Sequence, residues 1–163
     1  MNLDNKLAHN DPSKEKIKFI LELFNSDKLV DVENEIKNQL TKFPKSSVLL
    51  NIRGAVFVKQ NKLKEALLNY SESIKINPSY AQAYNNLGVC LYKLEKINEA
   101  IKNYEKAIEI QPNNTESHNN LGVAFKDLGK SEKAIRCYEK AIEIQPNHAD
   151  AHNNLGVAFK DLG

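Results

Sequence analysis

The chain has 163 residues, of which 27% are charged and 41% are hydrophobic, and its formal net charge is +2. A charge this close to zero, with no run of Lys and Arg, argues against a dedicated surface for nucleic acid or membranes. No apolar stretch reaches the length of about 18 residues that a membrane helix needs, and residues 1–12 lack the apolar segment of a signal peptide. We therefore expect a cytoplasmic protein.

A period of 34 residues runs through most of the sequence. Prolines, glycines and alanines recur at this step: Pro44, Pro78, Pro112 and Pro146; Gly54, Gly88, Gly122 and Gly156; Ala66, Ala100 and Ala134. A fixed period of this size indicates stacked copies of one supersecondary unit. Such an array presents an extended surface and seldom a catalytic pocket.

The N-terminal part of the chain departs most from the period. Residues 1–12 are polar, and we expect them to form a flexible tail. Residues 13–46 stay in register and end at Pro44, but Ile20 and Val32 stand where later copies have glycine and alanine. Their apolar residues, spaced by three and four, predict two helices. We interpret 13–46 as a divergent first repeat that caps this end of the array.

Three complete units follow, at 47–80, 81–114 and 115–148. In the second of them, AQAYNNLGVCLYKL predicts a first helix and INEAIKNYEKAIEI a second, because apolar residues recur every three or four positions. Pro112 ends the second helix. A glycine in mid-helix, such as Gly88, costs about 1 kcal/mol relative to alanine. Its recurrence therefore predicts a close approach of the paired helices.

The last range, 149–163, has the pattern of one first helix without a second helix to cover it. The segment HNNLGVAFKDLG occurs identically at 118–129 and at 152–163, which indicates recent duplication. We expect that the chain is truncated and that 149–163 begins a further repeat. The alternative is a terminal capping helix, although this range keeps the apolar side chains of Leu155 and Phe159.

Short signatures identify the kind of repeat. They are NNLG at 85–88, EA at 99–100, YEKAIEI at 104–110 and Pro112, and the next copy matches at the same spacing. These units resemble the tetratricopeptide repeat. The resemblance implies an all-α fold, a right-handed superhelical solenoid of antiparallel helix hairpins whose first helices line the concave side. It also implies a protein–protein interaction module that binds a peptide or partner segment in the concave groove.

On a helical wheel, one side of each first helix lies opposite its packing face, and we expect that side to bind the partner. The predicted partner-binding residues are Asn51, Lys59, Asn85, Asn86, Val89, Lys93, Asn119, Asn120, Val123, Asp127, Asn153, Asn154 and Asp161. Asparagines form a double column in this set, and each amide carries a donor and an acceptor for an extended peptide backbone.

The column is similar to the asparagine ladder in the repeat arms of O-linked N-acetylglucosamine transferases, with Asn86, Asn120 and Asn154 at the matching positions. The alternative is that these asparagines bond between neighbouring repeats. A clamp for a terminal carboxylate, found in chaperone-binding members of the family, needs Lys or Arg on this face. The corresponding places here hold asparagine and valine, so we do not expect a clamp.

Charge on this face changes along the chain. Lys59 and Lys93 lie early, whereas Asp127 and Asp161 lie late. Because opposite charges attract, we expect a bound segment to place acidic residues toward the first repeats and basic residues toward the last.

The sequence contains none of the common catalytic, phosphate-binding or metal-binding motifs, so we expect no enzymatic activity in this chain, no cofactor and no metal. His148 and His152 have a spacing that can hold a metal on a helix, but we expect His118 and His152 to fill a packing position. Cys90 and Cys137 are expected to be free thiols, the first packed and the second exposed.

Three functions remain. The first is the binding module described above, with a protein or extended peptide as partner and no nucleic acid or membrane. The second is the substrate-recruiting N-terminal arm of a larger transferase or oxygenase, as in bacterial proteins with similar arrays. The third is a self-associating scaffold, because the uncovered C-terminal helix carries Leu155, Phe159 and Leu162.

Overall fold

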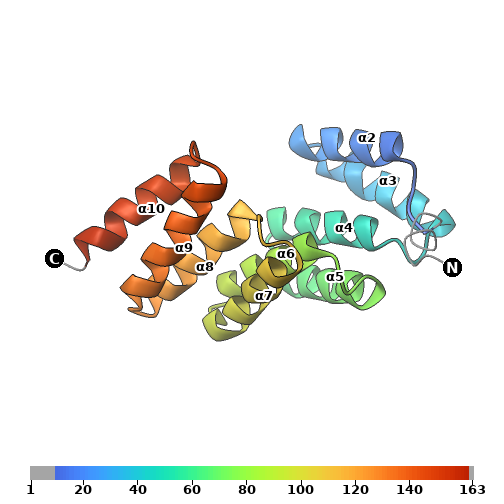
Figure 1. Cartoon of the computed structure of the whole chain (residues 1–163). Helices are drawn as coiled ribbons and strands as arrows, with labels where there is room; N and C mark the ends of the chain where they lie inside the picture. The colour runs from blue at the N-terminus through green and yellow to red at the C-terminus, as the bar shows by residue number, and fades with distance from the viewer. Residues whose placement is uncertain (1–9, 162–163) are drawn as a thin grey trace, which may run out of the picture. The chain divides into compact units, whose positions relative to one another are not determined.

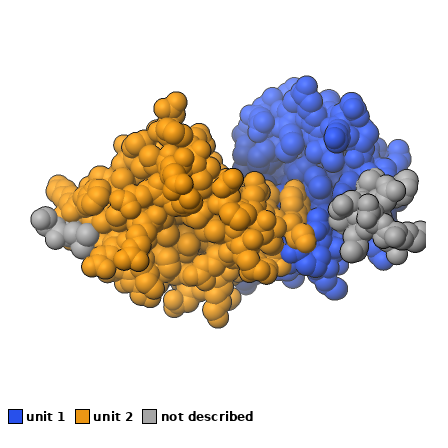
Figure 2. All heavy atoms as spheres, in the orientation of Figure 1, with its two compact units in different colours: residues 1–78 blue, residues 79–163 orange. Residues whose placement is uncertain are grey.

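The structure is a computed structural model, and it describes residues 10–161. Across these residues the chain forms nine α-helices and no β-strand (Figure 1). The helices belong to two compact units that divide between Pro78 and Ser79 (Figure 2). In a repeat array each hairpin contacts only its neighbours, and the described residues form separate apolar clusters, one around Ile20 and Ile36 and another around Ala134 and Tyr138. None of the helices in residues 10–161 combines the length and apolar character that crossing a membrane requires.

Unit 1 contains two helix pairs. The first pair is α2 (Lys14–Asn25) with α3 (Leu29–Lys42), and the second is α4 (Ser47–Lys59) with α5 (Leu63–Ile76). Serine side chains cap both first helices. Ser13 Oγ accepts a hydrogen bond from the Lys16 backbone N–H at 3.3 Å, and Ser46 Oγ accepts one from that of Leu49 at 3.1 Å.

Unit 2 contains two helix pairs and one further helix. The pairs are α6 (Ala81–Lys93) with α7 (Ile97–Ile110) and α8 (Thr115–Asp127) with α9 (Ser131–Ile144). The further helix, α10 (Ala149–Lys160), packs against α9. Figure 1 shows α6 to α10 in chain order from green to red.

In each of the four helix pairs, the turn after the first helix contains one residue in the left-handed backbone conformation. Its φ is +57° at Asp27, +59° at Asn61, +60° at Glu95 and +68° at Gly129, always 34 residues apart. The next residue donates its backbone N–H back across the last turn; the Lys96 N–H, for example, reaches the Leu91 carbonyl at 3.0 Å. This is the Schellman arrangement, which satisfies carbonyl groups that the helix end leaves open. Residue type predicts this left-handed turn clearly only in the last pair, where Gly129 occupies the position.

The recurrent mid-helix glycines face a tyrosine ring in the second helix of the same pair. A Cβ atom added at Gly54, Gly88 or Gly122 would stand 2.5 Å from Cε1 of the tyrosine 16 residues later, Tyr70, Tyr104 or Tyr138. These tyrosines are 0–2% exposed. The ring therefore takes the space that a side chain would fill, which confirms the close approach predicted for Gly88 and identifies its partner.

The first pair of unit 1 achieves the same packing with other residues. Ile20 replaces the glycine and Ile36 the tyrosine, and both are completely buried. They join Val32, Leu49 and Val56 in one apolar cluster, which links α2 and α3 to α4. The divergent sequence of 13–46 thus supports a helix pair through aliphatic packing instead of a ring on a glycine.

We predict opposite stability effects of alanine at two equivalent glycines. Gly122→Ala should lower the free energy of unfolding by about 1–3 kcal/mol, because its Cβ meets the Tyr138 ring. Gly156→Ala should raise it by up to about 1 kcal/mol, because nothing lies within 4 Å of that position and alanine favours the helix. Urea unfolding of both variants checks this, and equal shifts in the same direction would contradict it.

A second prediction concerns the left-handed turn positions. Glu95 adopts φ +60° with a side chain that disfavours it, whereas Gly129 adopts φ +68° without strain. Glu95→Gly should therefore stabilise the protein by about 0.5–1 kcal/mol, and Gly129→Glu should destabilise it by a similar amount. Thermal melting would show the two shifts, and a lower melting temperature for Glu95→Gly would be evidence against strain at Glu95.

Candidate functional site

The candidate site is the side of α6, α8 and α10 that carries the predicted asparagines. In this part of unit 2 the first asparagine of each pair is not equally accessible. Asn85 is 4% exposed and Asn119 is 7% exposed, whereas Asn153 is exposed. The wheel placed all three opposite the packing face, and for Asn85 and Asn119 the structure corrects this. A helical wheel identifies the face that packs on the paired helix. In a stack, each first helix also packs against the first helix of the next repeat, and the wheel does not show that contact.

Hydrogen bonds between successive first helices explain the burial. Asn120 Nδ2 donates to Asn85 Oδ1 at 3.1 Å, and Ser117 Oγ donates to the same oxygen at 3.1 Å. One step further along, Asn154 Nδ2 donates to Asn119 Oδ1 at 3.0 Å. We call this set of inter-helix bonds the asparagine ladder. Burying an amide is costly unless it is hydrogen-bonded, and the ladder satisfies that requirement.

The second asparagine of each pair stays partly exposed. Asn86, Asn120 and Asn154 all fall in this class, as do Val89 and Val123. Asn86 Oδ1 accepts a hydrogen bond from Gln82 Nε2 at 2.9 Å within α6. For Asn120 and Asn154, one amide hydrogen points into the ladder, and within the described residues no hydrogen bond to either Oδ1 is recorded. These two oxygens can accept a hydrogen bond from a ligand.

The charged residues of the predicted binding set differ in the interactions that their side chains make. Lys93 is exposed at the end of α6. The carboxylate of Asp127 accepts a hydrogen bond from the Tyr92 hydroxyl, which raises the pKa of Tyr92 to about 12. This contact connects the C-terminal ends of α6 and α8. Asp161 follows α10 and lines a hollow together with Lys130, Glu132 and Lys133.

The two predicted residues of unit 1 are both engaged within that unit or buried in it. Asn51 is 5% exposed in α4. Lys59 Nζ lies 3.0 Å from Asp27 Oδ1 and donates to the Phe24 carbonyl at 3.2 Å. It also stands 4.4 Å from the centre of the Phe24 ring. The expectation that Lys59 offers a cation to a ligand therefore lacks support, because its charge connects α4 to the end of α2.

The histidines hold backbone and side-chain groups together. His118 Nε2 lies 2.9 Å from the Pro112 carbonyl and His152 Nε2 lies 2.8 Å from that of Pro146. His148 caps α10: its Nδ1 accepts from the Ala151 N–H at 3.1 Å, so Nε2 carries the proton and faces Glu116 Oε2 at 3.4 Å. Among residues 10–161 no three His, Cys, Asp or Glu side chains are grouped to hold a metal ion.

The two cysteines are free. Cys90 is completely buried, as expected. Cys137 is partly buried, not exposed as the sequence indicated, because it lies in α9 of a three-helix stack. Burial, with a smaller contribution from Glu105, raises the pKa of Cys137 to about 11. The thiol therefore stays protonated near neutral pH and is a poor nucleophile.

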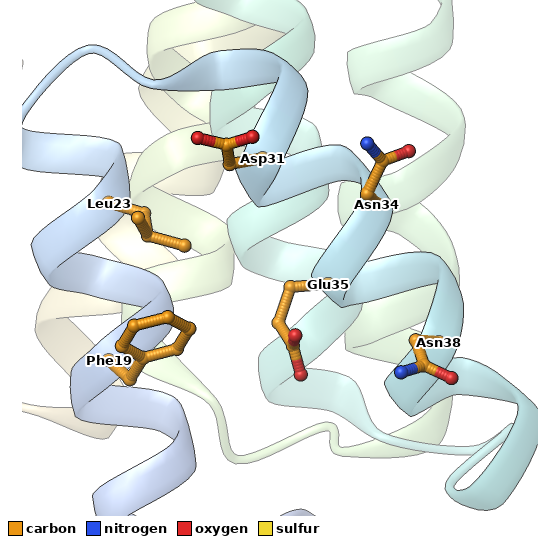
Figure 3. A pocket seen from close by; sticks show the side chains of 6 residues that line it. All are labelled: Phe19, Leu23, Asp31, Asn34, Glu35 and Asn38. Carbon is orange, nitrogen blue, oxygen red and sulfur yellow. The ribbon is translucent and has the colours of Figure 1, made fainter.

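A hollow between α2 and α3 is a further candidate that sequence reasoning missed (Figure 3). Phe19 and Leu23 from α2 face Asp31 and Glu35 from α3 across it. Glu35 accepts a hydrogen bond from Gln39 at 2.9 Å and pairs with Lys16 at 3.1 Å, and both lower the pKa of Glu35. Its charge is thus satisfied within unit 1, so the hollow offers no carboxyl group poised for acid–base chemistry.

Comparison with known proteins places these features in a family. Family models described as tetratricopeptide repeats match residues 54–95, 79–147 and 137–163. The crystal structure of MamA is similar, with a TM-score of 0.74 and 22% identity over 85% of this chain and 81% of that chain. The first repeat domain of Spaghetti (RPAP3), bound to the HSP90 peptide SRMEEVD, has a TM-score of 0.70 and 26% identity over 71% of this chain and 92% of its own.

The APC/C hetero-tetramer Cut9–Hcn1 is also similar, with a TM-score of 0.80 and 17% identity, and the match covers 88% of this chain but 29% of that chain. No curated protein matches the sequence. The family models together extend from residue 54 to residue 163, and the helix pairs, the glycine–tyrosine contacts and the solved structures agree with them. The chain belongs to the tetratricopeptide repeat family, and its fold is an all-α helical-repeat solenoid.

Proposed function

We propose that unit 2 binds an extended segment of a partner protein along α6, α8 and α10. Tetratricopeptide repeat arrays act as protein-interaction modules, and the similar RPAP3 domain is bound to a peptide. The observation that carries the proposal is the asparagine ladder. It fixes Asn120 and Asn154 at equivalent places on successive helices while their Oδ1 atoms remain available.

The ladder supports a hydrogen-bond donor as the group that binds there. Asn120 and Asn154 each already donate one amide hydrogen to the preceding first helix. Their oxygens are the groups best placed to meet a ligand, and a peptide backbone supplies N–H donors at regular intervals. Partly exposed Val89 and Val123 lie three residues after Asn86 and Asn120, so they can contact apolar side chains of the bound segment.

Charge argues against an acidic ligand at the α8 and α10 end. Lys93 is the predicted cation of unit 2, whereas Asp127 and Asp161 are acidic and exposed. The HSP90 peptide SRMEEVD carries three acidic residues, and holding such a segment requires cations. We therefore propose a neutral or basic segment, bound through its backbone, and not a terminal carboxylate.

The test is a peptide array made of 12-residue segments with blocked ends and varied net charge. The variant Asn86→Ala/Asn120→Ala/Asn154→Ala should lose at least tenfold in affinity for the peptides that the native chain binds. The matched control is Asn98→Ala/Asn113→Ala/Asn147→Ala, which removes three exposed asparagines outside the first helices. Fluorescence anisotropy would measure both, and equal affinities for the two variants would place binding elsewhere.

A separate prediction tests whether the buried asparagines of the ladder stabilise the fold. Asn85→Ala should lower the free energy of unfolding by about 1–3 kcal/mol, because it leaves Ser117 Oγ and Asn120 Nδ2 without their shared acceptor. Asn153→Ala, at the same repeat position but exposed, should change it by less than about 0.5 kcal/mol. Urea unfolding provides the comparison, and similar losses at both sites would mean that the ladder does not contribute to stability.

A further inference from the structure

Asn120 and Asn154 hold equivalent places on neighbouring first helices. Asn120 Nδ2 donates to Asn85 Oδ1 at 3.1 Å, and Asn154 Nδ2 donates to Asn119 Oδ1 at 3.0 Å. Because the same bond fixes both side chains, 34 residues apart, their Oδ1 atoms repeat with the spacing of the helices that carry them. Helix α8 contacts both α6 and α10, and packed helices lie about 8–10 Å apart. The two oxygens thus form a row of acceptors with a step of this size.

This step discriminates between the conformations that a bound backbone can adopt. An α-helix uses its N–H groups internally, so it offers the row few donors. An extended strand rises about 3.3 Å per residue and points every second N–H to the same side, so its donors recur at about 7 and 13 Å. A polyproline II helix rises about 3.1 Å per residue with three residues per turn, so its N–H groups return to one side every 9 Å or so. Of the three, the polyproline II helix matches the step of the asparagines.

We propose that Asn120 and Asn154 recognise a proline-rich segment of a partner protein in the polyproline II conformation. Two residues of the segment, three positions apart, donate their backbone N–H groups to the two Oδ1 atoms. The residues between them need no N–H group, so they can be proline, which lacks one and holds its backbone close to this conformation. The inference rests on the proposed function and specifies the segment that binds.

Valines beside the asparagines favour proline at the intervening positions. Val123 follows Asn120 by three residues and Val157 follows Asn154 by three, so each valine neighbours its asparagine on the helix surface. Val123 is partly exposed and Val157 is 46% exposed. A pyrrolidine ring is apolar and has almost no side-chain entropy to lose, so its contact with a valine removes apolar surface from water at little cost in order.

The test compares two labelled 12-residue peptides with blocked ends, which differ in the spacing of their N–H groups. One consists of Pro-Pro-Ala units and presents an N–H at every third residue, and the other consists of Pro-Ala units and presents one at every second. Both favour polyproline II, and the Pro-Ala peptide has more donors. In fluorescence anisotropy with the full chain, the Pro-Pro-Ala peptide should bind about fivefold more tightly, because it can reach both oxygens and the other peptide only one.

Two changes remove the hydrogen bonds from opposite sides. N-methylalanine in place of each alanine removes the donors of the Pro-Pro-Ala peptide without altering the protein, and it should weaken binding by about fivefold or more. Asn120→Ala/Asn154→Ala removes the acceptors and should bring both peptides to the same affinity. The matched control Asn113→Ala/Asn147→Ala changes two exposed asparagines outside the helices and should keep the native preference.

The outcomes separate this inference from the proposed function. If the native chain binds both peptides equally and Asn120→Ala/Asn154→Ala weakens both, the groove stands and the polyproline II assignment is wrong. A preference that survives this double substitution would overturn the inference, because the peptide would then bind elsewhere. Failure of the Pro-Pro-Ala peptide to bind would also overturn it, whereas the array of mixed peptides tests the groove independently of proline.

Discussion

The contact between a helix glycine and the tyrosine ring of its paired helix sets the geometry of each complete repeat. Because glycine has no Cβ, the ring lies directly on the first-helix backbone, and the two helices approach more closely than side chains would allow. Alanines at 66, 100 and 134 are completely buried in the second helices. This close approach sets the spacing of the paired helices, and asparagines on successive first helices of unit 2 lie within hydrogen-bonding distance of one another.

The asparagines illustrate how one residue type serves two purposes. Asn85 and Asn119 accept hydrogen bonds inside the stack, whereas Asn120 and Asn154 donate these bonds and are also partly exposed. Replacing Asn120 or Asn154 would therefore remove an inter-repeat hydrogen bond together with the proposed ligand contact. For this reason, substitutions at buried Asn85 and exposed Asn153 are needed to separate an effect on stability from an effect on binding.

Much of the fold could be predicted from the sequence, because the 34-residue period places helices, turns and prolines at once. Helix α6, for example, lies at Ala81–Lys93 within the predicted first helix. The left-handed turns could not be recognised from residue type, since Asp, Asn, Glu and Gly share the position. The candidate site was predicted less well. A wheel on one helix cannot show that Asn85 is covered by the next repeat, nor that Lys59 is paired with Asp27.

The ladder bonds also have a direction. At each recorded step, the donor belongs to the later helix and the acceptor to the earlier one. The hydrogen bonds of the ladder therefore all point in one direction along the chain. Asn153, at the same repeat position as Asn85 and Asn119, is exposed on α10 and carries the same side-chain amide oxygen that accepts from the following first helix at those two positions. A helix that donated to the Asn153 oxygen would therefore repeat the bond that Asn120 makes to Asn85 and that Asn154 makes to Asn119.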